Sequence, residues 1–151
     1  MAIRREGRES AVQFFYQRDI QGPEAFDRQD LAVVMREFWA TIRRPRNAQA
    51  FAESLIRGTR EHLPEIDRRL QEAARNWTLD RMSAVDRNVL RVAAYEMLYC
   101  EETPPVVAMN EAIEIAKRLS TPEAGKFVNG ILDRLKEDVL RPLRHASGSA
   151  E

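Results

Sequence analysis

Apolar residues recur at the spacing of an α-helix along almost the whole 151-residue chain. In one clear example, Leu31, Val34, Met35, Phe38 and Trp39 fall at positions i, i+3, i+4, i+7 and i+8, so they share one helix face. Sustained alternation of apolar and polar residues, which is typical of half-buried β-strands, does not occur in the sequence. This pattern predicts an all-α fold.

Capping and turn residues divide this pattern into about seven predicted helices. Ser83 followed three residues later by Asp86 is typical of a helix start. Pro104 ends one helix because the residue before a proline is pushed out of the helical region, and Thr121 with Pro122 begins the last. The predicted helices span about 3–19, 27–42, 48–56, 64–74, 83–98, 106–119 and 121–141.

A chain of this length fits one domain, and we expect residues 1–142 to form it. The connections are short, so neighbouring helices should pack against each other in one body. Residues 143–151 are small and polar, with too little apolar area to offset the entropy lost on ordering. They are predicted to form a flexible C-terminal tail.

The sequence offers no export or membrane signal. Its first residues lead into charged side chains rather than an apolar segment, and no apolar run is long enough to cross a bilayer. Cys100 is the single cysteine, so it cannot form an intramolecular disulfide, and a cysteine-based zinc site cannot be assembled. These features predict a cytoplasmic protein without a metal.

Catalytic chemistry also lacks support. His62 and His145 are the two histidines, and neither has a plausible triad partner nearby. No glycine-rich nucleotide-binding loop is present. The carboxylates of Glu101 and Glu102 fall near a predicted helix end, where solvated charge is the ordinary explanation. We therefore predict that the chain is not an enzyme and needs no cofactor.

The 24 basic and 24 acidic residues give a formal net charge of zero. Whole-molecule attraction to a nucleic acid is then weak, so any such contact requires a local basic face. Arg4, Arg5 and Arg8 on the first predicted helix are the candidate, although an isolated arginine cluster is more often only a solvated surface. Glu6 and Glu9 between and beside them weaken the local field.

Four segments of the chain together resemble the NusB family: the arginine-rich residues 4–16, and residues 76–98, 110–117 and 126–133. They occur in the family's order and spacing and run from about Arg4 to Asp133. Helical periodicity constrains residue class but not the identity of polar residues such as Gln13, Asn110 and Lys126. Packing alone would not select them, so the match indicates family membership.

The resemblance implies a fold of seven helices in two packed subbundles and a non-catalytic function. Members of the family pair with NusE, a small-subunit ribosomal protein, and the pair binds the boxA segment of nascent RNA. With other Nus factors the complex joins RNA polymerase and suppresses early termination on ribosomal RNA operons. The chain is thus expected to be a transcription antitermination factor, and a homodimer in the free state is left open.

The resemblance also implies site residues. The predicted RNA-binding residues are Arg4, Arg5, Arg8, Gln13, Tyr16, Lys126, Phe127 and Asn129. Arginine and lysine would contact phosphates, while the amides and aromatic rings would read or stack on unpaired bases. Phe127 is equally well explained as a core residue. The prediction requires Arg5 and Lys126 to lie on one side of the molecule.

Asp86 and Glu96 are the residues predicted to meet basic groups of NusE. Asp86 has an alternative role, because an acidic residue in the first turn also stabilises a helix by capping.

Three other functions were considered. The chain could be the RNA-binding domain related to that of ribosomal RNA cytosine methyltransferases, but it contains no methyltransferase domain. It could be a helical protein-interaction or homodimerisation module whose arginines only aid solubility. A helix-turn-helix DNA-binding function is disfavoured, because the net charge is zero and no basic recognition helix is evident.

Overall fold

The computed structural model describes the backbone of residues 2–22 and 30–150 and the side chains of residues 3–22 and 30–139. Within these ranges it contains α-helices and one 3-10 turn but no strand, which confirms the all-α prediction. The elements are α1 (Ala2–Gln21), α3 (Leu31–Thr41), α4 (Arg46–Glu61), α5 (Leu63–Ala74), η1 (Leu79–Arg81), α6 (Ala84–Tyr99), α7 (Pro105–Leu119) and α8 (Ala124–Ala150).

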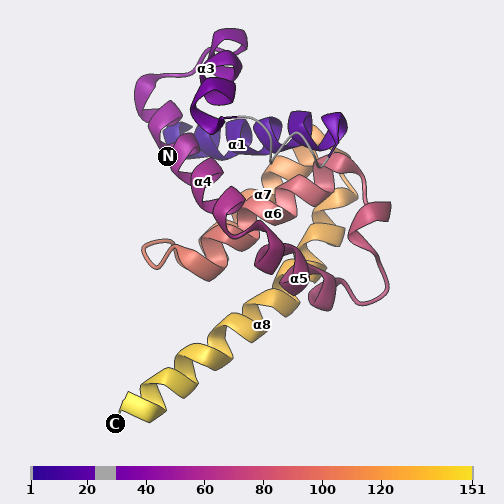
Figure 1. Cartoon of the computed structure of the whole chain (residues 1–151). Coiled ribbons are helices and arrows are strands. Elements are labelled where there is room, and N and C mark those ends of the chain that lie inside the picture. The colour runs from indigo at the N-terminus through magenta and orange to yellow at the C-terminus, as the bar shows by residue number, and fades with distance from the viewer. Residues whose placement is uncertain (1, 23–29, 151) are drawn as a thin grey trace.

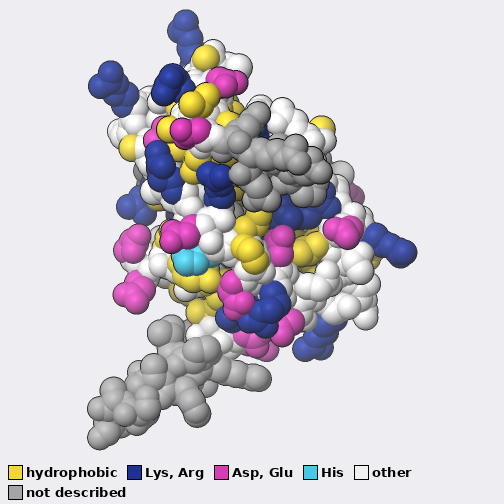
Figure 2. Space-filling model, viewed as in Figure 1, with side chains coloured by type: hydrophobic (Ala, Val, Ile, Leu, Met, Phe, Trp, Pro, Cys, Tyr) yellow, Lys and Arg dark blue, Asp and Glu magenta, His cyan; other side chains and the backbone are white. Residues whose placement is uncertain are grey.

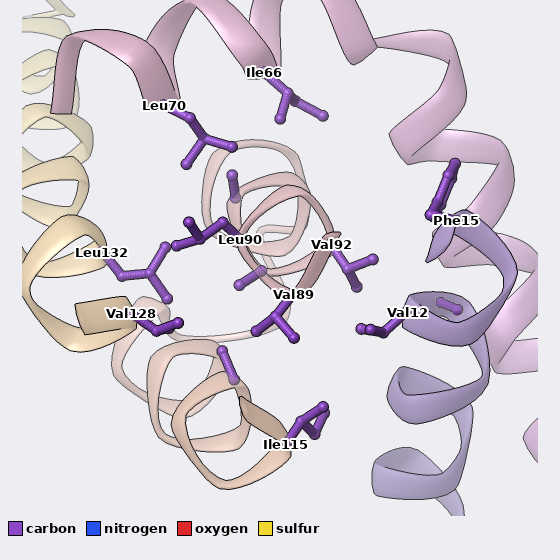
Figure 3. Close-up of a cluster of buried hydrophobic side chains, with 14 of the residues drawn as sticks. Val12, Phe15, Ile66, Leu70, Val89, Leu90, Val92, Ile115, Val128 and Leu132 are labelled. Atoms are coloured by element: carbon purple, nitrogen blue, oxygen red, sulfur yellow. The ribbon is translucent and has the colours of Figure 1, made fainter. Parts of the chain in front are cut away.

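Helix α6 is the centre of the fold. It packs against α1 and α4 on one side and against α5, α7 and α8 on the other, so the two groups of helices share it (Figure 1). Figure 3 shows Val89, Leu90 and Val92 of α6 among buried side chains from its neighbours. Almost every face of α6 is therefore buried, and the helices around it carry the outward surface.

The predicted capping residues Ser83 and Thr121 form their hydrogen bonds, but α8 begins at Ala124 rather than at Pro122, where the sequence placed its first helical residue. The Ser83 hydroxyl accepts a hydrogen bond from the Asp86 backbone N–H at 3.1 Å, and the Thr121 hydroxyl accepts one from the Ala124 N–H at 3.1 Å. Both bonds satisfy backbone donors that have no partner inside the helix. The predicted helix over 27–42 begins at Leu31, capped by the Asp30 carboxylate; residues 23–29 lie outside the described part of the chain.

Helix α8 is longer than the sequence suggested. The structure continues it to Ala150, whereas Arg141 and Pro142 were expected to end it, and its last turns extend away from the other helices in Figure 1. A proline removes one backbone hydrogen bond of a helix and often bends or breaks it, but the backbone here stays helical on both sides of Pro142. Flexibility of residues 143–151 stays a prediction.

A polar cluster attaches the C-terminal end of α1 to α6. The Asp19 carboxylate accepts hydrogen bonds from Arg87 at 2.7 Å, Asn88 at 2.9 Å and Arg91 at 3.3 Å, and Arg91 also binds Asp67 of α5. Burial alone would raise the pKa of Asp19, but these bonds outweigh it and hold the pKa below its ordinary value. The cluster fixes the direction in which α1 leaves the core.

Gly58 of α4 allows the close approach of α6. A Cβ atom at this position would overlap the ring of Tyr95, whereas a Cβ at Gly130 of α8 would meet no atom within 4 Å. We expect Gly58→Ala to lower the free energy of unfolding by about 1–3 kcal/mol through overpacking. Gly130→Ala should raise it by up to about 1 kcal/mol, because alanine is the better helix former.

Urea unfolding followed by circular dichroism measures both glycine variants. Both substitutions add one methyl group to a helix. Opposite changes in the free energy of unfolding would therefore show that the contact with Tyr95 causes the loss in Gly58→Ala. Equal effects of the two substitutions would contradict the close approach.

None of the helices in the described ranges combines the length and apolar character needed to cross a membrane.

Candidate nucleic-acid interface

The three arginines at the start of α1 lie in different surroundings. Arg4 is exposed, and its guanidinium carbon lies 5.2 Å from the centre of the Phe51 ring on α4, a cation–π contact. Arg5 points toward α7 and binds its residue Glu111. Arg8 is only 3% exposed. The sequence pattern could not separate these environments, because all three residues fall within two turns of one helix.

Arg5 is exposed but already bound to a carboxylate. Its Nε and Nη2 atoms donate to one oxygen of Glu111 at 3.0 and 2.7 Å, and its side chain remains 46% exposed. The hydrogen bond and the charge of Glu111 raise the pKa of Arg5 above its ordinary value. Arg5 therefore remains a cation at the surface, and a phosphate would share it or compete for it with Glu111.

Arg8 and Glu96 form a buried ion pair between α1 and α6. Two guanidinium nitrogens of Arg8 donate to the two Glu96 oxygens at 2.7 and 2.9 Å, and both side chains are less than 5% exposed. A third contact joins Arg8 to Glu111 at 3.4 Å. Arg8 was expected to contact RNA and Glu96 to contact NusE. The structure instead turns them toward each other inside the molecule, so we leave both out of the binding surfaces.

Two ion pairs between long side chains link α1 to α7 and mark the edge between these helices. Arg5 binds Glu111, and further along both helices Arg118 Nη1 lies 2.9 Å from Glu9 Oε1. Glu111 and Arg118 are seven residues apart and share one face of α7. The two helices therefore run in the same direction along this edge. Arg118 lies at the far end of the edge, and its cationic side chain is 63% exposed.

Gln13 and Tyr16 lie on the same face of α1 as Arg5 and Glu9. Arg5, Glu9 and Gln13 are spaced by four residues, and Tyr16 lies seven after Glu9, so they share the edge of α1 beside α7. Both side chains are half-buried. The amide oxygen of Gln13 is buried, and no donor for it occurs among the described residues. This oxygen is closed to solvent, so a base can meet only the amide nitrogen of Gln13 unless the side chain rotates.

The start of α8 lies on the opposite edge of α7. A Cβ at Gly125 would lie 2.9 Å from the Lys117 side chain and 3.3 Å from that of Ile113, so Gly125 packs directly on these α7 residues. Lys126 and Asn129, which are both exposed, follow Gly125 on this outer side of α8. Lys117 adds a further exposed cation at the same place.

Arg5 and Lys126 consequently flank one outward face of α7, on which the exposed residues Asn110 and Glu114 lie. We call this region the α1–α7–α8 surface. Its members are Arg5, Gln13, Tyr16, Asn110, Glu114, Lys117, Arg118, Lys126 and Asn129. The sequence did not single out Lys117 or Arg118. Their side chains join this surface only because α1, α7 and α8 pack together.

Phe127 lies on another side of α8. Its ring meets the Trp77 ring edge-on, with centroids 5.5 Å apart, and Arg134, on the same side of α8, donates to the Ala73 carbonyl of α5. Phe127 is partly buried against the core, while Trp77 remains 53% exposed. The structure thus gives Phe127 a packing role toward α5 and separates it from Asn129.

Asp86 is a half-buried residue in the first turn of α6. Its backbone N–H is bound to Ser83, but its own oxygen Oδ1 is buried, and no hydrogen-bond donor for it occurs in the described part of the chain. Ser83 therefore caps α6, while one carboxylate oxygen of Asp86 accepts no hydrogen bond from the described residues.

No group of histidine, cysteine or acidic side chains in the described ranges is arranged to hold a metal ion.

Comparison with known proteins gives a consistent result. The chain matches the NusB family model over residues 5–137. The transcription antitermination protein NusB of Desulfotalea psychrophila is 43% identical over 136 residues, which cover 90% of this chain and 96% of that protein. The protein of the same name from Symbiobacterium thermophilum is 41% identical over 150 residues, which cover 98% and 95%.

Solved structures agree. NusB of T. maritima has a TM-score of 0.75 at 39% identity, covering 89% of this chain and 90% of that one. A complex of the antitermination factors NusB and NusE with double-stranded RNA contains a chain with a TM-score of 0.76 at 24% identity, covering 91% and 98%. At that identity the second match supports the fold alone.

Proposed function

The chain belongs to the NusB family of transcription antitermination proteins, and from this premise we propose that it binds boxA RNA together with NusE. It acts as an adaptor that tethers the RNA to the RNA polymerase elongation complex and other Nus factors, in the cytoplasm where transcription occurs. It catalyses no reaction. In support, a solved structure of similar fold contains NusB and NusE in complex with double-stranded RNA.

The observation that supports the RNA role best is the grouping of Arg5, Lys117, Arg118 and Lys126 around one outward face of α7. Guanidinium and ammonium groups provide the salt-dependent part of RNA affinity. Tyr16 and Asn129 border them and supply a ring and an amide for unpaired bases, and Gln13 adds its amide nitrogen.

The acidic residues limit the affinity of the chain alone. Glu111 forms an ion pair with Arg5, and Glu9 forms one with Arg118. Glu114 adds a third carboxylate on the same face of α7. The local field is therefore weaker than four cations would produce, and NusE has to add positive charge and contact area.

A filter-binding titration tests this function. We expect weak binding of boxA RNA by the chain alone and binding at least tenfold tighter when NusE is present. A boxA sequence with scrambled bases is the control, and it should lose most of the gain. The proposed function is wrong if boxA and the scrambled RNA bind equally well both to the chain alone and to the chain with NusE.

The partner role of Asp86 can be separated from capping. Asp86→Lys should weaken NusE binding about tenfold or more, because it reverses the charge of a carboxylate that would meet basic groups. Ser83→Ala removes the cap and should cost about 1 kcal/mol of stability while leaving NusE affinity unchanged. Calorimetric titration with NusE and thermal unfolding measure both. Equal loss of NusE affinity in the two variants would assign Asp86 to capping.

A further inference from the structure

A second basic region lies outside the α1–α7–α8 surface, on α3 and α4. Residues 31–61 contain six arginines and three glutamates, so this segment is positive while the chain as a whole is neutral. Figure 2 shows Lys and Arg side chains gathered over α3 and α4 in the upper part of the molecule. The arginines are Arg36, Arg43, Arg44, Arg46, Arg57 and Arg60. The proposed function uses none of them.

The corner between α3 and α4 contains an open hollow of about 340 Å³. This volume lies within the range of small-ligand pockets, roughly 300–1,000 Å³, and the hollow is open to solvent. Its lining combines an aromatic ring, two guanidinium groups and a side-chain amide: Trp39, Ile42, Arg43, Arg44, Pro45 and Gln49.

The wall of the hollow is held in place by hydrogen bonds. The Trp39 indole N–H donates to Glu53 at 2.8 Å, which fixes the orientation of the ring. Gln49 donates to the Arg44 carbonyl at 3.0 Å, and Arg44 donates to the Arg43 carbonyl at 3.1 Å. Because these bonds already restrict the connection between α3 and α4, less conformational entropy is lost when a ligand binds there.

The hollow is connected to the α1–α7–α8 surface across α1. Arg44 Nε donates to the Ser10 hydroxyl at 3.1 Å, while the adjacent residue Glu9 faces Arg118 on α7. The outward strip of α1 therefore has an arginine on each side. One RNA strand lying on α7 would cross this strip, which also carries Glu6, by passing between Arg118 and Arg44 to the hollow.

We propose that the α3–α4 hollow is a second RNA subsite, which binds one unpaired nucleotide next to boxA. Its base stacks on Trp39 and its phosphate binds Arg43 and Arg44. The proposal rests on the proposed function and adds the path of the RNA beyond α7. An acidic peptide would also be attracted to these arginines, but a ring and a guanidinium group that line one hollow match a base joined to a phosphate.

Binding of boxA RNAs lengthened by one nucleotide at a time, on either side, to the chain with NusE tests the subsite. One particular extension should raise the affinity about tenfold, the effect of stacking one base. Arg43→Glu should abolish this gain and leave the affinity for boxA itself within about twofold. Arg43 is exposed, so the substitution does not disturb the core.

Arg57→Glu is the matched control. Arg57 is an exposed arginine of α4, the helix that follows Arg43, and undergoes the same charge change. It lies about 16 Å along α4 from its start, which is two screening lengths at physiological salt. It should keep the gain from the extension. Equal loss in both variants would indicate a diffuse charge effect and overturn the subsite.

A direct readout is fluorine NMR of the chain labelled with fluorotryptophan. The Trp39 signal, assigned with Trp77→Phe, should shift with the extended RNA and not with boxA alone. No gain from any extension, with boxA binding intact, overturns the subsite but leaves the proposed function standing. Loss of NusE affinity in Arg43→Glu without RNA would show that a protein occupies the hollow, and would also overturn the proposal.

Discussion

Replacing Arg8 by methionine is expected to lower the free energy of unfolding by about 3–5 kcal/mol. Methionine keeps the length of the side chain but removes both hydrogen bonds to Glu96, which is 1% exposed. The Glu96 carboxylate is then buried without its counter-ion, and this desolvated charge, rather than lost packing, causes the loss. For a protein of this size, the melting temperature should fall by roughly 6–20 °C.

The double variant Arg8→Met/Glu96→Leu identifies the cause. It removes both charges and fills the space with apolar atoms, so it should recover most of the stability of the unsubstituted chain. A double-mutant cycle by urea unfolding measures the coupling. If Arg8→Met alone costs less than about 1 kcal/mol, the pair is not buried as the structure has it.

The second large effect concerns RNA. Substituting Arg5, Lys117 and Lys126 together by alanine should weaken boxA binding by the complex with NusE about 100-fold near 0.1 M salt. Each phosphate contact of a single strand contributes about 0.7 to the slope of log affinity against log salt, so the slope should fall by about 2. Filter binding at several salt concentrations measures both quantities.

A matched triple variant controls for net charge. Arg36, Arg57 and Arg68 lie on α3, α4 and α5, away from the α1–α7–α8 surface, and their replacement by alanine removes the same number of charges. This variant should keep the salt slope and lose less than about threefold in affinity. Equal slopes for the two triple variants would contradict the location of the RNA surface.

The helical period and the capping residues predicted the fold well because both depend on local geometry. Ser83 and Thr121 form the hydrogen bonds expected of helix starts, and the buried face of α6 follows its apolar spacing. The close approach at Gly58 could not be predicted, because it depends on which ring, that of Tyr95, the neighbouring helix places there.

The site was predictable only in part, since an arginine in a helix has the same pattern whether its partner is water, RNA or a buried carboxylate. Arg5 lies at the surface as expected, whereas Arg8 is enclosed with Glu96. Lys117 and Arg118 looked like ordinary cations at a helix end. Their proximity to Lys126 and Arg5 arises from tertiary packing, which no periodicity encodes.

The most direct test of the account is an amide NMR spectrum of the labelled chain in complex with unlabelled NusE, recorded with and without boxA RNA. The account predicts that the RNA shifts amide signals in the first four turns of α1, in α7 from Asn110 onward and in the first turns of α8. Shifts confined to α5, η1 and the start of α6, with α1 and α7 unchanged, would contradict it.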